Sequence, residues 1–381
     1  MKNTIQCILA VTAPFLVVLS SASCYRPDVP TPQGPNPGDP LPGLTQTELS
    51  QFHMGKILFE REFTIKTGLG PKFNSVSCRE CHEHPETGGS GANELGGDDV
   101  ETHASKFQNN LCNELESDGG PVFRHNAIND GQLDNIPPST ELGVGHRTTP
   151  PLFGFGLIEN IPDETLVNLQ PYTGGHVHRL PNGNIGRFGR KATDPNLTSF
   201  IHGAFSKEQG IEIPSELSQE DLELTVKFVQ LLAPVQRLKP DKNGQFLFKA
   251  IGCTKCHVPT LHTGCSLSLP VSKNSQGQQT CQITSSVINA LEDKDVDLYS
   301  DLLLHDMGAV DMCRGDAKPN EFRTAPLMGM RFLKTFMHDG RAKNVEDAID
   351  AHAGQAKDAR NRFNNLSDTD KARIVRFVKS L

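Results

Sequence analysis

The pattern Cys-x-x-Cys-His occurs twice in this chain, at 78–82 and at 253–257. Composition alone gives roughly 0.01 chance matches in a sequence of this length, so two matches are not accidental. Two thiols at this spacing reach the two vinyl groups of one haem, and the adjacent histidine stands under the iron. We therefore expect two covalently bound haem c groups. The predicted haem residues are Cys78, Cys81, His82, Cys253, Cys256 and His257.

Two other readings of the motif lack support in the sequence. A zinc site needs a second pair of thiols or histidines at matching distance from each motif. A thioredoxin-like thiol pair needs a βαβ context, which the sequence does not offer. Haem attachment remains the interpretation for both motifs, with His82 and His257 as iron ligands.

The chain also repeats itself around the two motifs. Each copy has a Gly-x-x-Leu-Phe helix, a haem motif, an Arg-Thr-x-Pro segment and a closing helix. From His82 to Arg147 is 65 residues, and from His257 to Arg323 is 66. Each closing helix begins at a serine (Ser218 or Ser367) with an aspartate three residues later, typical of a capped helix start. An internal duplication predicts two domains of the same kind.

The spacing of apolar residues in the closing helices predicts one buried face on each. Between the landmarks, segments rich in glycine and proline suggest long loops that wrap the haems rather than sheets. We expect a mainly α fold with two tandem cytochrome c-like domains. The expected domains are a signal peptide at 1–23, a tether at 24–43, a first haem domain at 44–237 and a second at 238–381.

The N-terminus has the features of an export signal. Lys2 precedes an apolar stretch at 5–19, and small residues lead to Cys24. This pattern is typical of a bacterial lipoprotein, with ordinary signal cleavage as the alternative. The Pro- and Gly-rich segment that follows would stay extended as a tether. We expect an exported, periplasmic protein whose only membrane attachment is a lipid at Cys24.

Charge and cysteine content limit the partners and the compartment. The net charge of -8 argues against nucleic acid, because no basic surface would neutralise phosphates. Four cysteines outside the signal and the haem motifs suit disulfides in an oxidising compartment. We expect Cys265 to pair with Cys281 and, by elimination, Cys112 with Cys313, although the sequence does not fix this connectivity.

The chain after the tether resembles the di-haem oxidoreductase family, relatives of the bacterial di-haem cytochrome c peroxidases. The resemblance rests on these segments: GLGPKFNSVSCRECH, PPLFGFGLIENIPDETL, GRFGRKA, YSDLLLHDMG, FRTAPLMG and HDGRAKNVEDAIDAHAG. It implies two haems, a small redox protein as electron partner and hydrogen peroxide as a candidate substrate.

The resemblance also implies ligands for the second haem. In the related peroxidases a methionine lies fourteen residues after the histidine of the HDG segment, and here that position is His352. Rivals for this role are Met307 and His305 of the HDMG segment. A His/His haem has a lower potential than a Met/His haem, which weakens a direct transfer of peroxidase function.

For the first haem, the related enzymes suggest Glu159 as the catalytic carboxylate, since peroxide cleavage needs an acid-base group beside an open iron. A loop carboxylate or a partner of Arg147 is the alternative role for Glu159. Arg147 and Arg323 would contact haem propionates, or form structural ion pairs. Several histidines could instead close the first iron: His103, His125 and His146. His176 and His178 are expected at the surface.

The sequence departs from the family where GRFGWKA reads GRFGRKA, with Arg190 at the tryptophan position. The chain has no tryptophan, so electron hopping through an aromatic side chain would need Tyr172, Tyr299 or a phenylalanine. We expect a peroxidase-like enzyme in which the C-terminal haem passes electrons to a reactive N-terminal haem. The alternatives are a non-catalytic electron carrier with both irons six-coordinate, and a haem-based sensor.

Overall fold

The computed structural model describes residues 34–91, 100–128, 131–138, 142–264, 272–273, 279–280, 289–308 and 311–381. The helices are α1 (Gln46–Glu60), α2 (Cys78–Cys81), α3 (Phe155–Glu159), α4 (Asp163–Thr173), α5 (Leu197–Glu208), α6 (Gln219–Leu231), α7 (Lys242–Ala250), α8 (Val345–Asp350), α9 (Lys357–Asn364) and α10 (Asp368–Val378).

The strands are short, apart from β2 and β6. They are β1 (Lys72–Phe73), β2 (Val100–Gln108), β3 (Leu111–Asn113), β4 (Val122–Phe123), β5 (Asn126–Ala127), β6 (Leu142–Thr148), β7 (His178–Arg179), β8 (Ile185–Gly186), β9 (Leu261–His262), β10 (Ser272–Lys273), β11 (Gln279–Thr280), β12 (Asp295–Val296), β13 (Leu304–Asp306) and β14 (Glu321–Arg323).

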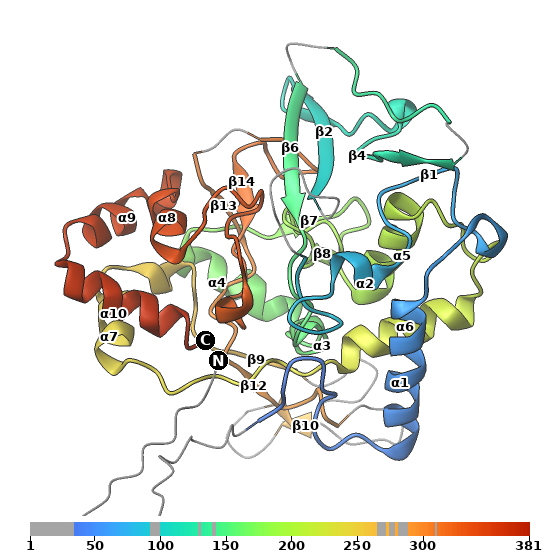
Figure 1. Cartoon of the computed structure of the whole chain (residues 1–381). Coiled ribbons are helices and arrows are strands. Elements are labelled where there is room, and N and C mark those ends of the chain that lie inside the picture. Colours follow the sequence, from blue (N-terminus) through green and yellow to red (C-terminus); the bar gives the residue numbers. More distant parts are fainter. Residues whose placement is uncertain are drawn as a thin grey trace, which may run out of the picture. The chain divides into compact units, whose positions relative to one another are not determined.

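The duplicated landmarks form two equivalent helix pairs, α1 with α6 and α7 with α10 (Figure 1). A glycine allows the close approach in each pair. A Cβ on Gly55 would lie 2.0 Å from the carbonyl oxygen of Leu224, and one on Gly244 would lie 2.1 Å from that of Arg373. The absence of a side chain at these two positions lets the helix backbones touch. The predicted duplication is therefore confirmed in three dimensions.

The closing helices begin as the sequence predicts. The Ser218 hydroxyl accepts a hydrogen bond from the backbone N–H of Asp221, and Ser367 accepts one from Asp370. These contacts satisfy N–H groups that have no partner inside the helix. The predicted apolar face of α10 is buried throughout, and α6 buries Phe228 and Leu231.

The segment between the first haem motif and Arg147 contains a sheet that the sequence analysis did not predict. Strand β2 pairs antiparallel with β6 on one edge and with β3 and β4 on the other. Gly143 and Gly145 of β6 lie against Asp311, where a Cβ would meet Asp311 atoms within 2.3 Å and 1.8 Å. These glycines read as loop residues in the sequence, but they serve close packing in a strand. The fold is thus a mixture of helices and small sheets rather than mainly α with haem-wrapping loops.

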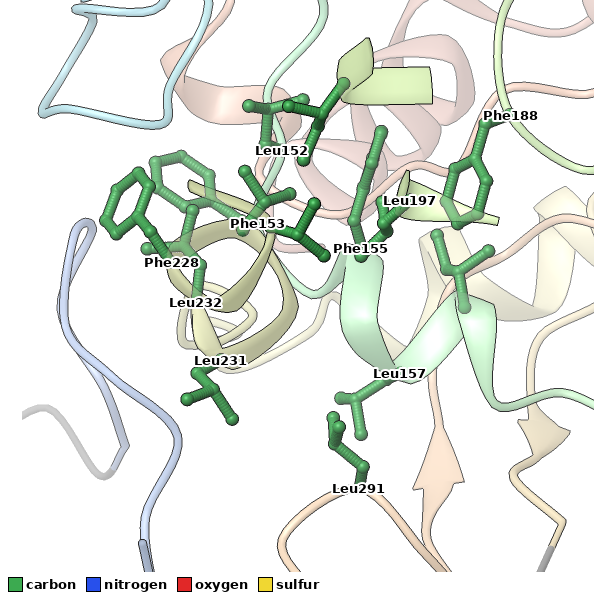
Figure 2. Packing of buried hydrophobic residues seen from close by; sticks show 14 of the residues in the cluster. Leu152, Phe153, Phe155, Leu157, Phe188, Leu197, Phe228, Leu231, Leu232 and Leu291 are labelled. Carbon is green, nitrogen blue, oxygen red and sulfur yellow. The ribbon is translucent and has the colours of Figure 1, made fainter. Parts of the chain in front are cut away.

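The apolar interior has two main clusters. The smaller is built around Phe248, Phe363 and Phe377 of the second half. The larger centres on α1, α3, α5 and α6 but also takes in Leu261, Leu291 and other side chains up to Leu303. In Figure 2, Leu291 lies beside Leu157 of α3. Contacts join the chain from Gly34 to Leu381 into one compact unit, and the predicted domain boundary at 237/238 stays a prediction.

The end of the predicted tether is packed, contrary to expectation. Backbone hydrogen bonds join Leu41 to Leu231, Asp39 to Ala233 and Pro35 to Gln236. Leu41 is buried. The chain that leaves α6 has free backbone groups, and an extended Pro-rich segment can pair with them. The predicted signal peptide and Cys24 lie outside the described residues. Among the described residues, no helix combines the length and apolar character needed to cross a membrane.

The predicted disulfide between Cys112 and Cys313 is confirmed, and it joins residues 201 positions apart. Cys313 is fully buried, and its backbone N–H donates to Ser105 of β2. The bond thus fixes the sheet of the first half to the 311–313 segment of the second. Cys265 and Cys281 lie outside the described residues, so their pairing stays a prediction.

The glycine at the α1–α6 crossing yields a stability test. Gly55→Ala should lower the free energy of unfolding by about 1–3 kcal/mol, because the helix backbones must separate. Gly203→Ala, at a position of α5 with nothing within 4 Å, is the matched control. It should raise stability by up to about 1 kcal/mol through helix propensity. Thermal unfolding of the two variants and the wild type measures both effects, and equal shifts for the two would contradict the close-contact argument.

Candidate haem centres

The first motif forms a single helical turn, α2, with its histidine at the turn's end. The hydroxyl of Ser77 accepts from the N–H of Glu80 and fixes the start of this turn. His82 Nδ1 donates to the carbonyl oxygen of Gly89 at 2.9 Å, which makes Nε2 the candidate ligand atom; the backbone of Pro150 also contacts the ring. Burial lowers the pKa of His82 to about 4. The ring is therefore neutral, as a metal ligand must be.

The second motif repeats this arrangement on a 3₁₀ turn at Cys253–Lys255. His257 Nδ1 donates to the carbonyl oxygen of Tyr299 at 2.9 Å, so its Nε2 is again free. Burial lowers the pKa of His257 to about 4 as well. A backbone acceptor that orients the ring is the usual support of a ligating histidine. Both predicted iron ligands are thus held in a ligating orientation.

The thiols do not suit thiol redox chemistry or zinc. Burial raises the pKa of Cys78 and of Cys253 to about 12, whereas a reactive cysteine has a lowered pKa. None of the four motif cysteines takes part in a disulfide. In the described part of the chain, none of them belongs to a group of side chains placed to hold a metal ion.

A phenylalanine links each proximal histidine to the helix pair behind it. Phe59 of α1 packs 5.8 Å from the His82 ring and 4.9 Å from Phe228 of α6, measured between ring centroids. Phe248 of α7 packs 6.2 Å from His257 and 5.3 Å from Phe377 of α10. The helix pairs of the duplicated fold therefore position the two histidines in the same way.

A largely apolar cavity of about 320 Å³ lies at the second motif. His257, Cys253 and Cys256 form part of its wall. Its other lining residues include Met330, Leu333, Phe336 and Ile349. Apolar walls with a few placed polar groups are typical of cofactor sites.

His352 lies opposite His257, as the resemblance implied. The two ring centroids are 6.4 Å apart. Two imidazoles that share one metal at about 2.0 Å from each nitrogen have their centroids separated by about 6 Å. His352 Nδ1 donates to the carbonyl oxygen of Ala348 at 2.6 Å, which leaves its Nε2 free. The spacing and the orientation both fit a haem iron held between the two rings.

The two rivals of His352 are placed differently. Met307 and His305 both line the cavity. His305 Nε2 lies 2.8 Å from the buried carboxylate of Asp301, and Nδ1 contacts Gln355 at 3.1 Å. Both ring nitrogens of His305 are therefore occupied. No ring contact joins His305 to His257 among the described residues.

Three arginines gather where the two halves meet, Arg147 buried and Arg190 and Arg323 partly buried. Arg190 and Arg323 line the cavity, and Arg147 is close enough to Arg190 to lower its pKa. Burial, followed by this repulsion, lowers the pKa of Arg190 to about 10; burial and Arg190 lower that of Arg323 to about 9. Arg147 pairs with Asp311 at 2.7 Å.

These arginines have donor atoms without acceptors. Arg147 Nη2 and Arg190 Nε are buried and make no hydrogen bond. Crowded buried cations with spare donors fit the carboxylates of haem propionates, which accept such bonds well. The predicted propionate role of Arg147 and Arg323 suits this arrangement, and Arg190 joins the same cluster.

Glu159 is held by two hydrogen bonds. Its two carboxylate oxygens accept from the backbone N–H of Leu197 at 2.7 Å and from Gln230 Nε2 at 2.9 Å. These bonds tie α3 to the start of α5 and to α6, so Glu159 has a structural role. Its role as the catalytic carboxylate of the first haem stays a prediction.

The predicted alternative ligands of the first iron, His103, His125 and His146, make no ring contact with His82 in the described part of the chain. All fourteen histidines of the chain lie within the described residues. Among these residues, the ring that packs against His82 is that of Phe59. His103 contacts Glu101, and His146 is exposed. His176 is partly exposed beside Glu321.

His178 is buried, contrary to the surface prediction, because its ring fills space between Lys191 and Gly315. Tyr172 is exposed, whereas Tyr299 is buried against Phe248 and Phe377. Of the two tyrosines considered for electron hopping, Tyr299 is therefore the one that lies near a haem motif.

Residues 197–381 match the family described as "Di-haem oxidoreductase, putative peroxidase". Over these residues the chain belongs to the di-haem oxidoreductase family. The match includes the second motif, His352 and α10, and the family name implies two haems. No curated protein matches the sequence.

Two solved structures resemble the fold at low similarity. Hydrazine synthase of Kuenenia stuttgartiensis has 14% identity and a TM-score of 0.45, covering 98% of this chain and all of that chain. A MauG-like protein associated with microbial copper homeostasis has 15% identity and a TM-score of 0.42, covering 94% and 95%. At TM-scores below 0.5, neither resemblance bears on function.

Replacing His352 tests its assignment. His352→Met should raise the potential of the second haem by at least about 100 mV, since thioether ligation favours the reduced iron. Redox titration of the haem absorption bands measures the change. His262→Gln, at an exposed histidine between Asp293 and Asp295, is the control and should leave both potentials unchanged. Unchanged potentials in His352→Met would show that another residue ligates this iron.

Proposed function

We propose that the mature protein carries two covalently attached haem c groups and acts as a peroxidase-like di-haem oxidoreductase. The second haem would accept electrons from a small redox protein and pass them to the first, where hydrogen peroxide is reduced. The observation that carries this proposal is the unequal surroundings of the two proximal histidines. His257 faces a second imidazole, and His82 does not.

The second centre suits electron transfer. When bound there, haem supplies an iron that changes its charge by one electron. His257 and His352 would hold this iron, and their backbone acceptors on Tyr299 and Ala348 keep both rings in place. Ligands fixed in this way would limit rearrangement of the site during electron transfer.

The first centre suits substrate chemistry. Phe59 contacts the His82 ring, and no second imidazole does so in the described residues. Peroxide reduction needs an iron with one open position. The reaction consumes two electrons and two protons, breaks the O–O bond and gives two water molecules. The electrons would enter through the second centre.

The route between the centres would cross the arginine cluster. Arg190 donates to the carbonyl oxygen of Thr148 at 2.9 Å, and Arg323 donates to that of Gly189 at 2.8 Å. Through Gly189 and Arg190, these bonds connect the Arg147–Pro150 segment of the first half with the Arg323–Pro326 segment of the second. The arginines of this cluster would hold the haem propionates.

A non-catalytic electron carrier is the second candidate. It is favoured by His352, because His/His ligation gives a lower potential than the Met/His ligation of the related peroxidases. Both candidates share the second centre and differ only at the first. The coordination of the first iron therefore decides between them.

Electron paramagnetic resonance of the mature protein, oxidised and half-reduced, tests the proposal. We expect a high-spin ferric signal from the first haem in at least one state, and consumption of peroxide with a reduced redox protein as donor. His352→Met should keep the high-spin signal, since it alters only the second haem. Low-spin signals alone in both states, without peroxide turnover, would leave the electron carrier as the function.

Export to the periplasm, with lipid attachment at Cys24, completes the proposal. Covalent haem attachment and the Cys112–Cys313 disulfide both suit an oxidising compartment outside the cytoplasm. Mass spectrometry of the mature N-terminus should find a lipidated Cys24 that Cys24→Ser removes. An unmodified N-terminus in the wild type would leave ordinary signal cleavage. The acidic chain would favour a redox partner with a basic docking surface.

A further inference from the structure

A second cluster of metal-binding side chains lies beside the first haem motif and has no part in the function proposed above. Glu101 and His103 of β2 and Glu208 at the end of α5 each offer a ligand atom, and these atoms all lie within 4.8 Å of one another. Glu101 and His103 alternate along β2, so both side chains point to the same face of the strand. Glu101 and Glu208 are near enough to Cys81 to affect its charge.

The spacing suits one cation. Glu101 Oε2 lies 2.7 Å from His103 Nε2. Neighbouring ligands of a first-row metal at about 2.1 Å from each donor are separated by about 3 Å. Glu208 offers the third ligand atom, within 4.8 Å of the other two. His103 is only 8% exposed, whereas the Glu101 side chain keeps 30% of its surface accessible, which would leave room for water ligands.

Two carboxylates lie close together in this cluster, and both are partly buried. Burial raises the pKa of Glu101 to about 7 and that of Glu208 well above its usual value. The guanidinium groups near Glu101 also have other acceptors: Arg147 pairs with Asp311, Arg314 with Glu114, and Arg190 donates to the carbonyl oxygen of Thr148. Two adjacent carboxylates in such a site either hold protons or share a cation.

The supporting groups are arranged as around a metal ligand. Asn74 is buried; its side-chain amide donates to Glu208 Oε2 at 2.6 Å, and its side-chain oxygen accepts from the N–H of His125. This fixes the Glu208 carboxylate, as second contacts of metal ligands do. His103 Nδ1 is buried without a hydrogen-bond partner, as is His125 Nε2. One ring nitrogen of the cluster and one of the neighbouring His125 therefore lack a hydrogen-bond partner.

We propose that Glu101, His103 and Glu208 bind a divalent, non-haem metal ion of the Mn²⁺ or Fe²⁺ type. Two carboxylates and one imidazole match the ligand preference of these ions. The proposed site uses none of the haem-motif residues, and the proposal stands whether or not the protein reduces peroxide. A divalent ion would neutralise the two carboxylates that lie near Cys81.

Mn²⁺ binding to the mature holoprotein, freed of loose metal with chelator, tests the proposal. Free Mn²⁺ is counted by its own paramagnetic resonance signal during titration. We expect saturation at one ion per chain. His103→Gln and Glu208→Gln should each weaken binding at least tenfold, whereas His262→Gln, which alters an exposed histidine between two aspartates, should not. Binding should also tighten as pH rises from 6 to 8, because the ligands lose protons on binding.

The wild type alone can overturn the proposal. Absence of saturable binding below about 1 mM Mn²⁺ would mean that the carboxylates hold protons instead. Equal binding by wild type and by both ligand variants would place the ion elsewhere. Haem absorption and thermal unfolding of each variant show whether it is folded. Peroxide turnover is measured separately, so loss of the peroxidase proposal and loss of the metal proposal remain distinguishable.

Discussion

The hydrogen bond from each motif histidine to a backbone carbonyl is the interaction on which the rest of this structure depends. His82 donates to Gly89 and His257 to Tyr299, and each bond turns the other ring nitrogen towards the haem position. The chain positions these carbonyls through the helix pairs behind them. Phe59 and Phe248 carry the contact from the histidines to Phe228 and Phe377. Packing of apolar side chains thereby controls the orientation of a polar ligand.

The junction between the two halves is polar, whereas the helix pairs are held by apolar packing. Arg147 pairs with Asp311, and Arg190 and Arg323 donate to backbone carbonyls of Thr148 and Gly189. Burial of several guanidinium groups is costly unless anions compensate them. The propionates of two haems are anions of the required kind. Cofactor binding and association of the two halves are therefore expected to stabilise one another.

The sequence predicted the repeated part of the site well and the unrepeated part poorly. The motif spacing and the caps at Ser218 and Ser367 were readable, because each depends on local chemistry. The Cys112–Cys313 bond was predicted by elimination, and only the structure decided this connectivity. The sheet of β2 and β6 was missed, since Gly143 and Gly145 resemble loop residues until Asp311 is seen beside them. Polar residues at every second position, Glu101 and His103, were the available sequence signal for strand β2. Glu159 was assigned by position alone, and Leu197 and Gln230 occupy its carboxylate.

The sequence by itself determined the chemistry: two thiol pairs with adjacent histidines, a duplicated helical frame and a candidate sixth ligand at position 352. The thiol pairs, their histidines and the helical frame follow from residue type and short spacing, which the chain carries whatever its fold, whereas position 352 is implied by the family resemblance. Only the tertiary structure decided which histidine faces which iron position and which buried charges gather. The ring centroids of His352 and His257 are 6.4 Å apart, although 95 residues separate them in the sequence. Glu208 of α5 lies within 4.8 Å of Glu101 of β2, measured between ligand atoms. Such contacts depend on the packing of distant segments, and no local pattern specifies them.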